Sequence, residues 1–380
     1  MSGTNVPDTY CAAAFDHIYS DNRGRYRLCC HAAPIKALGA FLSTNTVPFD
    51  YFLSEEMDDI RQRMLTGEPI HACQSCYDIE SDGGRSPRLT DHHSDQSFHR
   101  DVRDVELKLR VFGSYCNLGC YMCFPHNSST RRAELKSAAL EEFWDDDSLA
   151  GTSVDRVQYE KIVSNILANI GKVSHIKLTG GEPLLLPKHY EFLEQIPDSD
   201  AARITLSYDT NLTALHFKNW SFEEHVVPRF RSVRLAVSCD HYGDRLAWIR
   251  FPVDIETFEA NLVRARRWIR QLHCTVSILN VHDLAEIGSY YQERFGIATS
   301  FCSVVSRPKM LSICNLPDKE SLLKTLEQNP QIDAKVLTEL RRPACEADYR
   351  VGLDYVRRLD EHRRDRVVRA SLLWPWIEDA

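Results

Sequence analysis

The sequence predicts an α/β protein built around a parallel β-sheet. From Val105 onward, short apolar runs typical of strands alternate with longer segments that have the periodicity of amphipathic helices. This alternation favours parallel strands joined by right-handed helical crossovers. Cysteines, glycines and small polar residues directly follow several of the expected strands. Because the carboxyl ends of parallel strands lie at one edge, these residues are expected to converge there.

Six strand candidates carry this prediction. They are residues 106–112, 175–179, 203–207, 232–238, 274–279 and 299–304. The helices expected among them are residues 159–170, 188–195, 255–271 and 284–295. The helical pattern is clearest in residues 255–271, for which Asp254 is a suitable N-cap.

Three cysteines lie on the loop that leaves the first expected strand. Cys116, Cys120 and Cys123 have the spacing C-x3-C-x2-C. A short loop can direct three thiolates toward one point, and three thiolates on a four-iron cubane leave one iron without a protein ligand. Four-cysteine sites saturate such a cluster and suit electron transfer, whereas an open iron can bind a substrate or cofactor. For the triplet alone, a zinc site or a chance grouping of cysteines is the alternative.

A second motif, Gly180-Gly181-Glu182-Pro183, ends the expected strand 175–179. Two glycines allow the main chain to approach a ligand closely, and Glu182 and Pro183 fix the turn. For this motif alone, an ordinary strand-to-helix turn is the alternative. In this order and spacing, the cysteine triplet and the second motif together resemble those of radical S-adenosylmethionine (radical SAM) enzymes.

The resemblance implies a partial (β/α)6 TIM-like barrel whose cysteine triplet holds a catalytic [4Fe–4S] cluster. S-adenosylmethionine (SAM) would chelate the open iron, with its amino group near the backbone of Gly180, Gly181 and Glu182. The other SAM-contacting positions that the resemblance implies are Met122, Ser207, Asn211, Ser238, Asp240 and Arg250.

These positions differ in what the resemblance assigns to them. Met122 stands where the family usually has an aromatic residue beside the adenine. Ser207 and Asn211 fall in a ribose-contacting segment, with turn and cap roles as the alternative. Ser238 and Asp240 resemble an S-x-D-G segment, in which the serine and a following arginine hold the SAM carboxylate and ribose. Arg250 can make such a bidentate contact or a surface ion pair.

The first hundred residues contain a second group of cysteines: Cys11, Cys29, Cys30, Cys73 and Cys76. The spacings C-x12-G-x4-C and C-x2-C resemble an auxiliary-cluster module of SPASM or twitch type, here placed before the barrel. Four thiolates saturate a cubane, so the natural set is Cys11, Cys29, Cys73 and Cys76. Cys30 can replace Cys29, since sequence does not separate adjacent cysteines. Structural zinc, with His31 or His71 as a ligand, is the alternative.

The chain is expected to have three parts. Residues 1–100 form the cysteine-rich iron–sulfur module and a linker, residues 101–305 the barrel, and residues 306–380 a C-terminal helical extension. The first part should contain a hairpin around residues 18–29 and a helix within residues 49–65. Helices are expected around residues 322–326, 332–340 and 355–369 of the last part.

Composition limits the cellular setting. The 380 residues are 43% hydrophobic and 26% charged, enough for a large core and more than one substructure. A net charge of −8 disfavours general binding to nucleic acid or anionic membranes. We find no signal-peptide pattern and no membrane-spanning apolar run. The 13 cysteines are therefore expected to be reduced thiols or metal ligands in a cytoplasmic protein.

The sequence thus predicts a radical SAM oxidoreductase that cleaves SAM to a 5′-deoxyadenosyl radical and abstracts a hydrogen atom from its substrate. An auxiliary [4Fe–4S] cluster could accept the electron of a substrate radical. The expected substrate is a ribosomally made peptide that undergoes dehydrogenation, crosslinking or epimerisation; a small sugar, amine or alcohol is the alternative. A flavodoxin or ferredoxin would supply electrons. In another class, the chain would be a non-catalytic iron–sulfur electron-transfer or zinc-binding protein.

Overall fold

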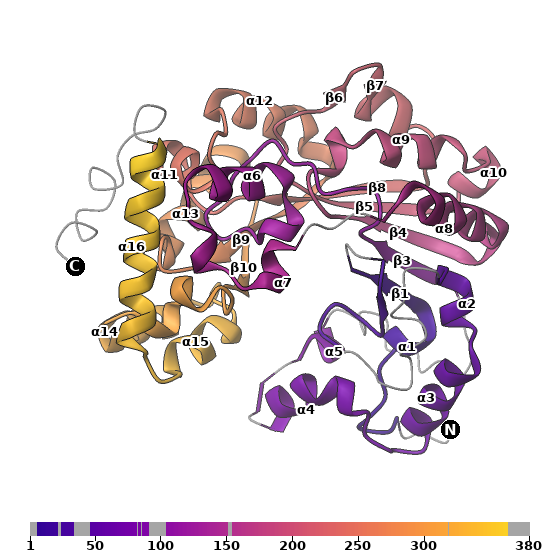
Figure 1. The fold of residues 1–380 in the computed structure, drawn as a ribbon, viewed down its shortest axis with the longest axis horizontal. Helices are drawn as coiled ribbons and strands as arrows, with labels where there is room; N and C mark the ends of the chain where they lie inside the picture. Colours follow the sequence, from indigo (N-terminus) through magenta and orange to yellow (C-terminus); the bar gives the residue numbers. More distant parts are fainter. Residues whose placement is uncertain are drawn as a thin grey trace.

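The computed structural model describes residues 6–21, 24–33, 46–81, 83–84, 86–90, 104–150, 154–317 and 319–363. At its centre is an eight-stranded sheet with the strand order β10-β9-β8-β5-β4-β3-β1-β2 (Figure 1). These strands are β1 (His17–Ser20), β2 (Tyr26–Arg27), β3 (Val105–Leu109), β4 (Val173–Leu178), β5 (Thr205–Thr210), β8 (Ser232–Ser238), β9 (Ile269–Val276) and β10 (Thr299–Val304). A separate two-stranded sheet pairs β6 (His216–Phe217) with β7 (Trp220–Ser221).

The helices fall into three groups along the chain. Before β3 lie α1 (Ala13–Asp16), α2 (Pro48–Phe52), α3 (Glu55–Leu65), α4 (Gln74–Ser81) and α5 (Pro87–Thr90). Between β3 and β10 lie α6 (Ser129–Ser137), α7 (Asp146–Leu149), α8 (Arg156–Ala168), α9 (Pro187–Glu194), α10 (Asp198–Ala201), α11 (Gly243–Ile249), α12 (Ile255–Ala265) and α13 (Leu284–Phe295). After β10 come α14 (Lys319–Glu327), α15 (Ala334–Arg341) and α16 (Glu346–Arg363).

The predicted α/β fold is confirmed. The strands β3, β4, β5, β8, β9 and β10 are neighbours in this order, and every adjacent pair is parallel. The sheet stays open because β10 and β2 are its two edges, so the barrel is partial. None of the helices in the described part of the chain is long and apolar enough to cross a membrane.

The two faces of this sheet differ in polarity. In β3, the side chains of Val105, Leu107 and Leu109 are buried, whereas Glu106 and Lys108 between them are half-buried. The alternation repeats in β5, and a period of two gives each strand one apolar and one polar face. The apolar faces form the core. The polar faces give the inner side of the partial barrel its ionisable side chains.

The N-terminal segment joins the same sheet, which the sequence did not predict. β1 pairs in parallel with β3, with Ile18 opposite Leu107, and the predicted hairpin is present because β1 also pairs with β2. Figure 1 shows α1 to α5 gathered beside this end of the sheet, and α14 to α16 at the other end. The N-terminal cysteines are therefore held by the sheet that carries the cysteine triplet.

The bounds of β8, β10 and α13 are as predicted, but one predicted helix is wrong. Residues 255–271 divide into α12, which ends at Ala265, and a 3₁₀ turn over Arg266–Trp268 that leads into β9. Pairing of β9 with β8 and β10 draws Ile269 and the following residues into the sheet. These long-range hydrogen bonds override the local helical pattern. Residues beyond 363 of the last predicted helix lie outside the described residues.

Candidate active site

The cysteine triplet lies on the loop between β3 and α6, at the carboxyl end of the sheet. Burial raises the pKa of all three thiols, and the Cys120 thiol raises the pKa values of Cys116 and Cys123 further; that of Cys123 reaches about 12. The thiols are therefore near neighbours. Buried thiols become thiolates most readily when they bind a metal, which stabilises the charged form.

Partners from several distant segments bind the backbone of this loop. The Ser128 hydroxyl donates to the Leu118 carbonyl at 3.3 Å, and the amide of Tyr121 donates to the Ile249 carbonyl at 3.1 Å. The Thr130 hydroxyl donates to the Cys116 carbonyl, and the Tyr355 hydroxyl donates to the Tyr121 carbonyl. Both backbone groups of Gly119 are bound, since its amide donates to the Phe251 carbonyl and its carbonyl accepts from Arg363. These bonds satisfy the polar groups of a buried loop and fix the directions of its cysteine side chains.

The Gly-Gly-Glu-Pro motif is packed against the beginning of the same loop. The amide of Glu182 donates to the Tyr115 carbonyl at 2.7 Å. A Cβ on Gly181 would lie 2.0 Å from that carbonyl oxygen, and Gly180 has a φ of +142°, which disfavours other residues. The structure therefore gives the two glycines an immediate role, because they allow the two motif backbones to meet.

Glu182 links the ends of β4 and β5. Its buried carboxylate accepts hydrogen bonds from the Thr210 hydroxyl at 2.6 Å and from the amide of Asn211 at 2.7 Å. The amide of Leu184 also donates to it. Burial raises the pKa of Glu182 to about 7, although these donors and Arg250 oppose the shift. Glu182 thus acts as a buried bridge between neighbouring strand ends.

The two predicted ribose contacts occupy different places. The Asn211 side-chain amide donates to the Cys116 sulfur at 3.7 Å and to the side-chain oxygen Oδ1 of Asn117 at 3.0 Å, at the edge of the triplet. Ser207 lies within β5, three positions before its end, and shares a 2.7 Å hydrogen bond with His175. Because β5 extends beyond the predicted end at residue 207, Ser207 lies on the inner barrel face instead of at the strand terminus.

The segment after β8 carries a buried ion pair. Arg250 Nε lies 2.7 Å from Asp240 Oδ2, while Asp240 Oδ1 accepts the amide of Thr275 at 2.8 Å. Arg250 Nη1 also donates to the Cys120 sulfur at 3.9 Å. Ser238 is half-buried as the last residue of β8. Arg250 does form an ion pair, but the pair is not on the surface, since 11% of the Arg250 side chain and none of the Asp240 side chain is exposed.

Met122 is buried, and its neighbour Tyr121 packs into the interior of the protein. The Tyr121 ring stacks on Trp248 with 4.0 Å between ring centroids and meets Tyr355 edge-on. Tyr121 therefore anchors the cysteine loop to α11 and α16. This leaves Met122 as the apolar residue next to Cys123, in the position that the resemblance assigns to an adenine contact.

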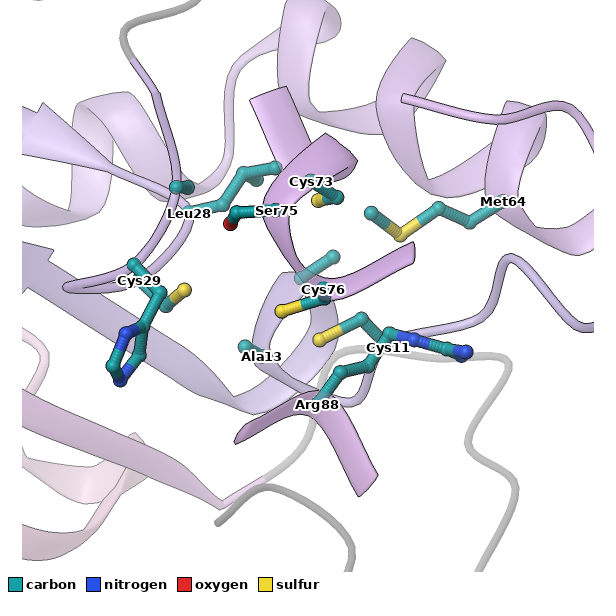
Figure 2. A pocket seen from close by; sticks show the side chains of 12 residues that line it. Cys11, Ala13, Leu28, Cys29, Met64, Cys73, Ser75, Cys76 and Arg88 are labelled. Carbon is teal, nitrogen blue, oxygen red and sulfur yellow. The ribbon is translucent and has the colours of Figure 1, made fainter. Parts of the chain in front are cut away.

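A pocket of about 370 Å³, including its opening to solvent, lies in the N-terminal segment. Cys11, Cys29, Cys73 and Cys76 all line it, as Figure 2 shows. Burial is the largest cause of the raised pKa values of Cys29, about 11, and Cys73, about 12. Burial and the other three thiols raise the pKa of Cys11 as well. The structure thus brings the four predicted cysteines together.

Cys30 is separated from this group. Its sulfur accepts a hydrogen bond at 3.4 Å from the ammonium group of Lys108, a residue of β3. Burial opposes ionisation, but hydrogen bonds and charge from His31 and Lys108 lower the pKa of Cys30 to about 6. Of the two histidines considered as zinc ligands, His31 lines the pocket and His71 does not.

Both groups consist of cysteines, and cysteine thiolates are the ligands of iron–sulfur clusters. Among the residues described, no three or more His, Cys, Asp and Glu side chains are close enough to hold one metal ion. Ligands of one tetrahedral zinc lie about 3.8 Å apart, whereas thiolates on a cubane are more widely spaced because each binds a different iron. Near the triplet, Arg131 Nε and Nη2 and Arg363 Nη1 are buried and have no hydrogen-bond partner among the described residues. Such orphaned cationic groups fit an anionic cluster.

Sequence reasoning missed Arg131, Glu134, Arg363 and Asn117, which all contact or surround the cysteine loop. The only local signal was Gly119. A Cβ at this position would lie 2.7 Å from Glu134 Oε2 and 2.9 Å from Arg363 Nη2. A glycine between two cysteines of such a motif therefore indicates close approach by another segment, although it does not identify that segment.

Comparisons with known proteins agree with this geometry. Residues 111–286, from the end of β3 into α13, match the family model of the Radical SAM superfamily. These residues of the chain are therefore a radical SAM domain. No curated protein sequence matches the chain.

Solved structures give looser likenesses. AnSMEcpe with bound AdoMet has 17% identity and a TM-score of 0.37, over 52% of this chain and 52% of its own. AnSMEcpe with bound AdoMet and Kp18Cys peptide has 16% identity and a TM-score of 0.37, over 69% and 62%. Streptococcus suis SuiB bound to S-adenosylmethionine has 14% identity and a TM-score of 0.38, over 77% and 56%. Each alignment spans less than two thirds of the solved chain.

Gly181→Ala is expected to destabilise the protein by about 3 kcal/mol or more, since the added methyl group would overlap the Tyr115 backbone. Gly171→Ala is the matched control, because nothing lies within 4 Å of a Cβ there. Urea unfolding of both variants measures the difference. Equal stability of the two variants would contradict the close contact between the motifs.

Proposed function

We propose that this chain is a radical SAM oxidoreductase that reductively cleaves SAM and uses the 5′-deoxyadenosyl radical to remove a hydrogen atom from a substrate. The observation that carries the proposal is the single loop with three neighbouring thiols, of which Cys120 is buried and Cys116 and Cys123 are half-buried, held by the Gly-Gly-Glu-Pro motif. The thiolates of Cys116, Cys120 and Cys123 would hold a [4Fe–4S] cluster, and three protein ligands leave one of its four irons for SAM.

Groups around the triplet support this role. The Asn211 amide and the Arg250 guanidinium donate toward the sulfurs of Cys116 and Cys120. Hydrogen bonds to cluster sulfurs raise the reduction potential, because they stabilise the more negative state. Gly180 and Gly181 position their backbone beside the loop, where the SAM amino group is proposed to bind. Buried aromatic residues such as Tyr121 keep water from the back of the loop.

The inner face of the partial barrel is a suitable surface for a polar substrate. Half-buried residues of opposite charge alternate on it, including the Lys177–Asp209 pair at 3.2 Å. The His175–Ser207 pair and Lys108 lie on the same side of the sheet. Such a surface can pair with the backbone amides and charges of a peptide. We therefore propose a ribosomally made peptide as the substrate.

The N-terminal pocket supports a second cluster. Four cysteines line it, which is the number that saturates a cubane and suits electron transfer. We propose that this auxiliary [4Fe–4S] cluster accepts the electron of a substrate radical, so that the net reaction is an oxidation. A flavodoxin or ferredoxin would reduce the catalytic cluster in the cytoplasm.

Cys29→Ser is expected to remove about four irons from the anaerobically reconstituted chain, leaving one cubane. Cys30→Ser is the matched control and should retain about eight, because Cys30 faces Lys108 and lies outside the pocket lining. Iron and sulfide analysis measures both. Loss of iron from the Cys30 variant alone, or zinc in the reconstituted pocket, would contradict the ligand set.

Cys116→Ala should reduce 5′-deoxyadenosine formation to background, because the triplet then lacks one cluster ligand. Cys73→Ala should still form 5′-deoxyadenosine but no oxidised product. Chromatography of quenched anaerobic reactions measures both compounds. Deoxyadenosine at the wild-type level from the Cys116 variant would overturn the proposed function and favour an electron-transfer or zinc-binding role.

A further inference from the structure

A buried cluster of charged side chains lies behind the cysteine loop. Arg131 of α6 and Arg363, the last residue of α16, are both fully buried. Both bind the carboxylate of Glu134: Arg131 Nη1 donates at 2.7 Å, and Arg363 donates through Nε at 2.7 Å and through Nη2 at 2.6 Å. Two guanidinium groups share one carboxylate, so this cluster has a net positive charge.

The Arg363 side chain joins the C-terminal helix to the loop. Its guanidinium donates to the Gly119 carbonyl, between the first and second cysteines of the triplet. The same group lies over the rings of Tyr121, at 4.7 Å, and Phe251, at 4.5 Å. Gly119 makes this contact possible, because a Cβ there would collide with both Arg363 and Glu134. Helix α16 thereby closes the back of the site.

The positive charges of Arg131 and Arg363 affect the pKa values of thiols in the triplet. Burial raises the pKa of Cys120, while the positive charges of Arg250, Arg363 and Arg131 oppose that shift. Arg131 acts on Cys123 in the same direction. The charge of Arg250 is largely balanced by Asp240, whereas the cluster of Arg131, Glu134 and Arg363 retains one positive charge.

Several N–H groups of these charged side chains have no hydrogen-bond partner in the part of the chain that the structure describes. They are Nε and Nη2 of Arg131 and Nη1 of Arg363, all buried. A buried guanidinium with unpaired N–H groups is costly. That cost falls when an anion lies nearby, and a cubane with thiolate ligands carries negative charge. The side chains of Arg131, Glu134 and Arg363 are thus arranged to stabilise a neighbouring group that becomes more negative on reduction.

We propose that Arg131 and Arg363, held by Glu134, are positioning residues that stabilise the reduced state of the triplet's cluster, which makes α16 part of the active site. The inference rests on the proposed [4Fe–4S] cluster and goes beyond it by assigning an electrostatic role to the C-terminal extension. Reduction adds one electron to the cluster, and a nearby positive charge favours that added negative charge. Removing the positive charge should therefore lower the reduction potential.

The test is an EPR-monitored redox titration of full-length protein, reconstituted anaerobically in a Cys73→Ala background so that only the triplet's cluster contributes. Arg363→Met and Arg131→Met should each lower the midpoint potential by at least 59 mV, a tenfold change in the one-electron equilibrium. Arg363→Lys, which keeps the charge, should restore most of the loss. Glu134→Gln should shift the potential in the opposite direction.

Arg358→Met is the matched control. Arg358 is on the same helix but is half-exposed and paired with Glu142, so its removal should leave the potential unchanged. An unchanged potential in iron-loaded Arg363→Met or Glu134→Gln protein would overturn the proposal. If the methionine variants fail to bind iron, an unshifted Glu134→Gln potential would leave these residues a merely structural role. Failure of the parent protein to form any cluster would instead refute the proposed function.

Discussion

The contact between the Gly181-Glu182 backbone and the Tyr115 carbonyl is the constraint on which the site depends. It joins the turn after β4 to the start of the cysteine loop after β3, with no space for a side chain on Gly181. The buried Glu182 carboxylate extends the same connection to the end of β5. Three neighbouring strand ends therefore form one rigid surface, and the positions of Cys116 and Asn211 follow from it.

The second organising feature is the parallel pairing of β1 with β3. It attaches the N-terminal cysteine pocket to the strand that leads into the triplet. Lys108 on β3 contacts Cys30, and the loop after β3 holds Cys116. An electron acceptor in the N-terminal pocket would therefore be tied to the barrel through continuous backbone hydrogen bonding. This arrangement supports the proposed oxidation more directly than a module on a separate linker would.

Features encoded by nearby residues could be predicted from the sequence. The triplet spacing, the Gly-Gly-Glu-Pro turn and the bounds of α13 and β10 are local patterns, and the structure agrees with them. Features that depend on contacts between segments far apart in the sequence could not be predicted. The end of the helix predicted over residues 255–271 is determined by the neighbours of β9, and the position of Cys30 outside the pocket lining goes with its contact to Lys108 of β3. Arg363 is 244 residues from Gly119, and no periodicity encodes that contact.

The most direct test of the account is the EPR spectrum of the reduced Cys73→Ala protein with and without SAM. An open iron on the triplet's cluster predicts that SAM changes the g-values of the signal, since SAM becomes a ligand of that iron. The change should saturate with SAM concentration. A spectrum that SAM leaves unaltered, or a triplet that takes up zinc instead of iron, would contradict the account.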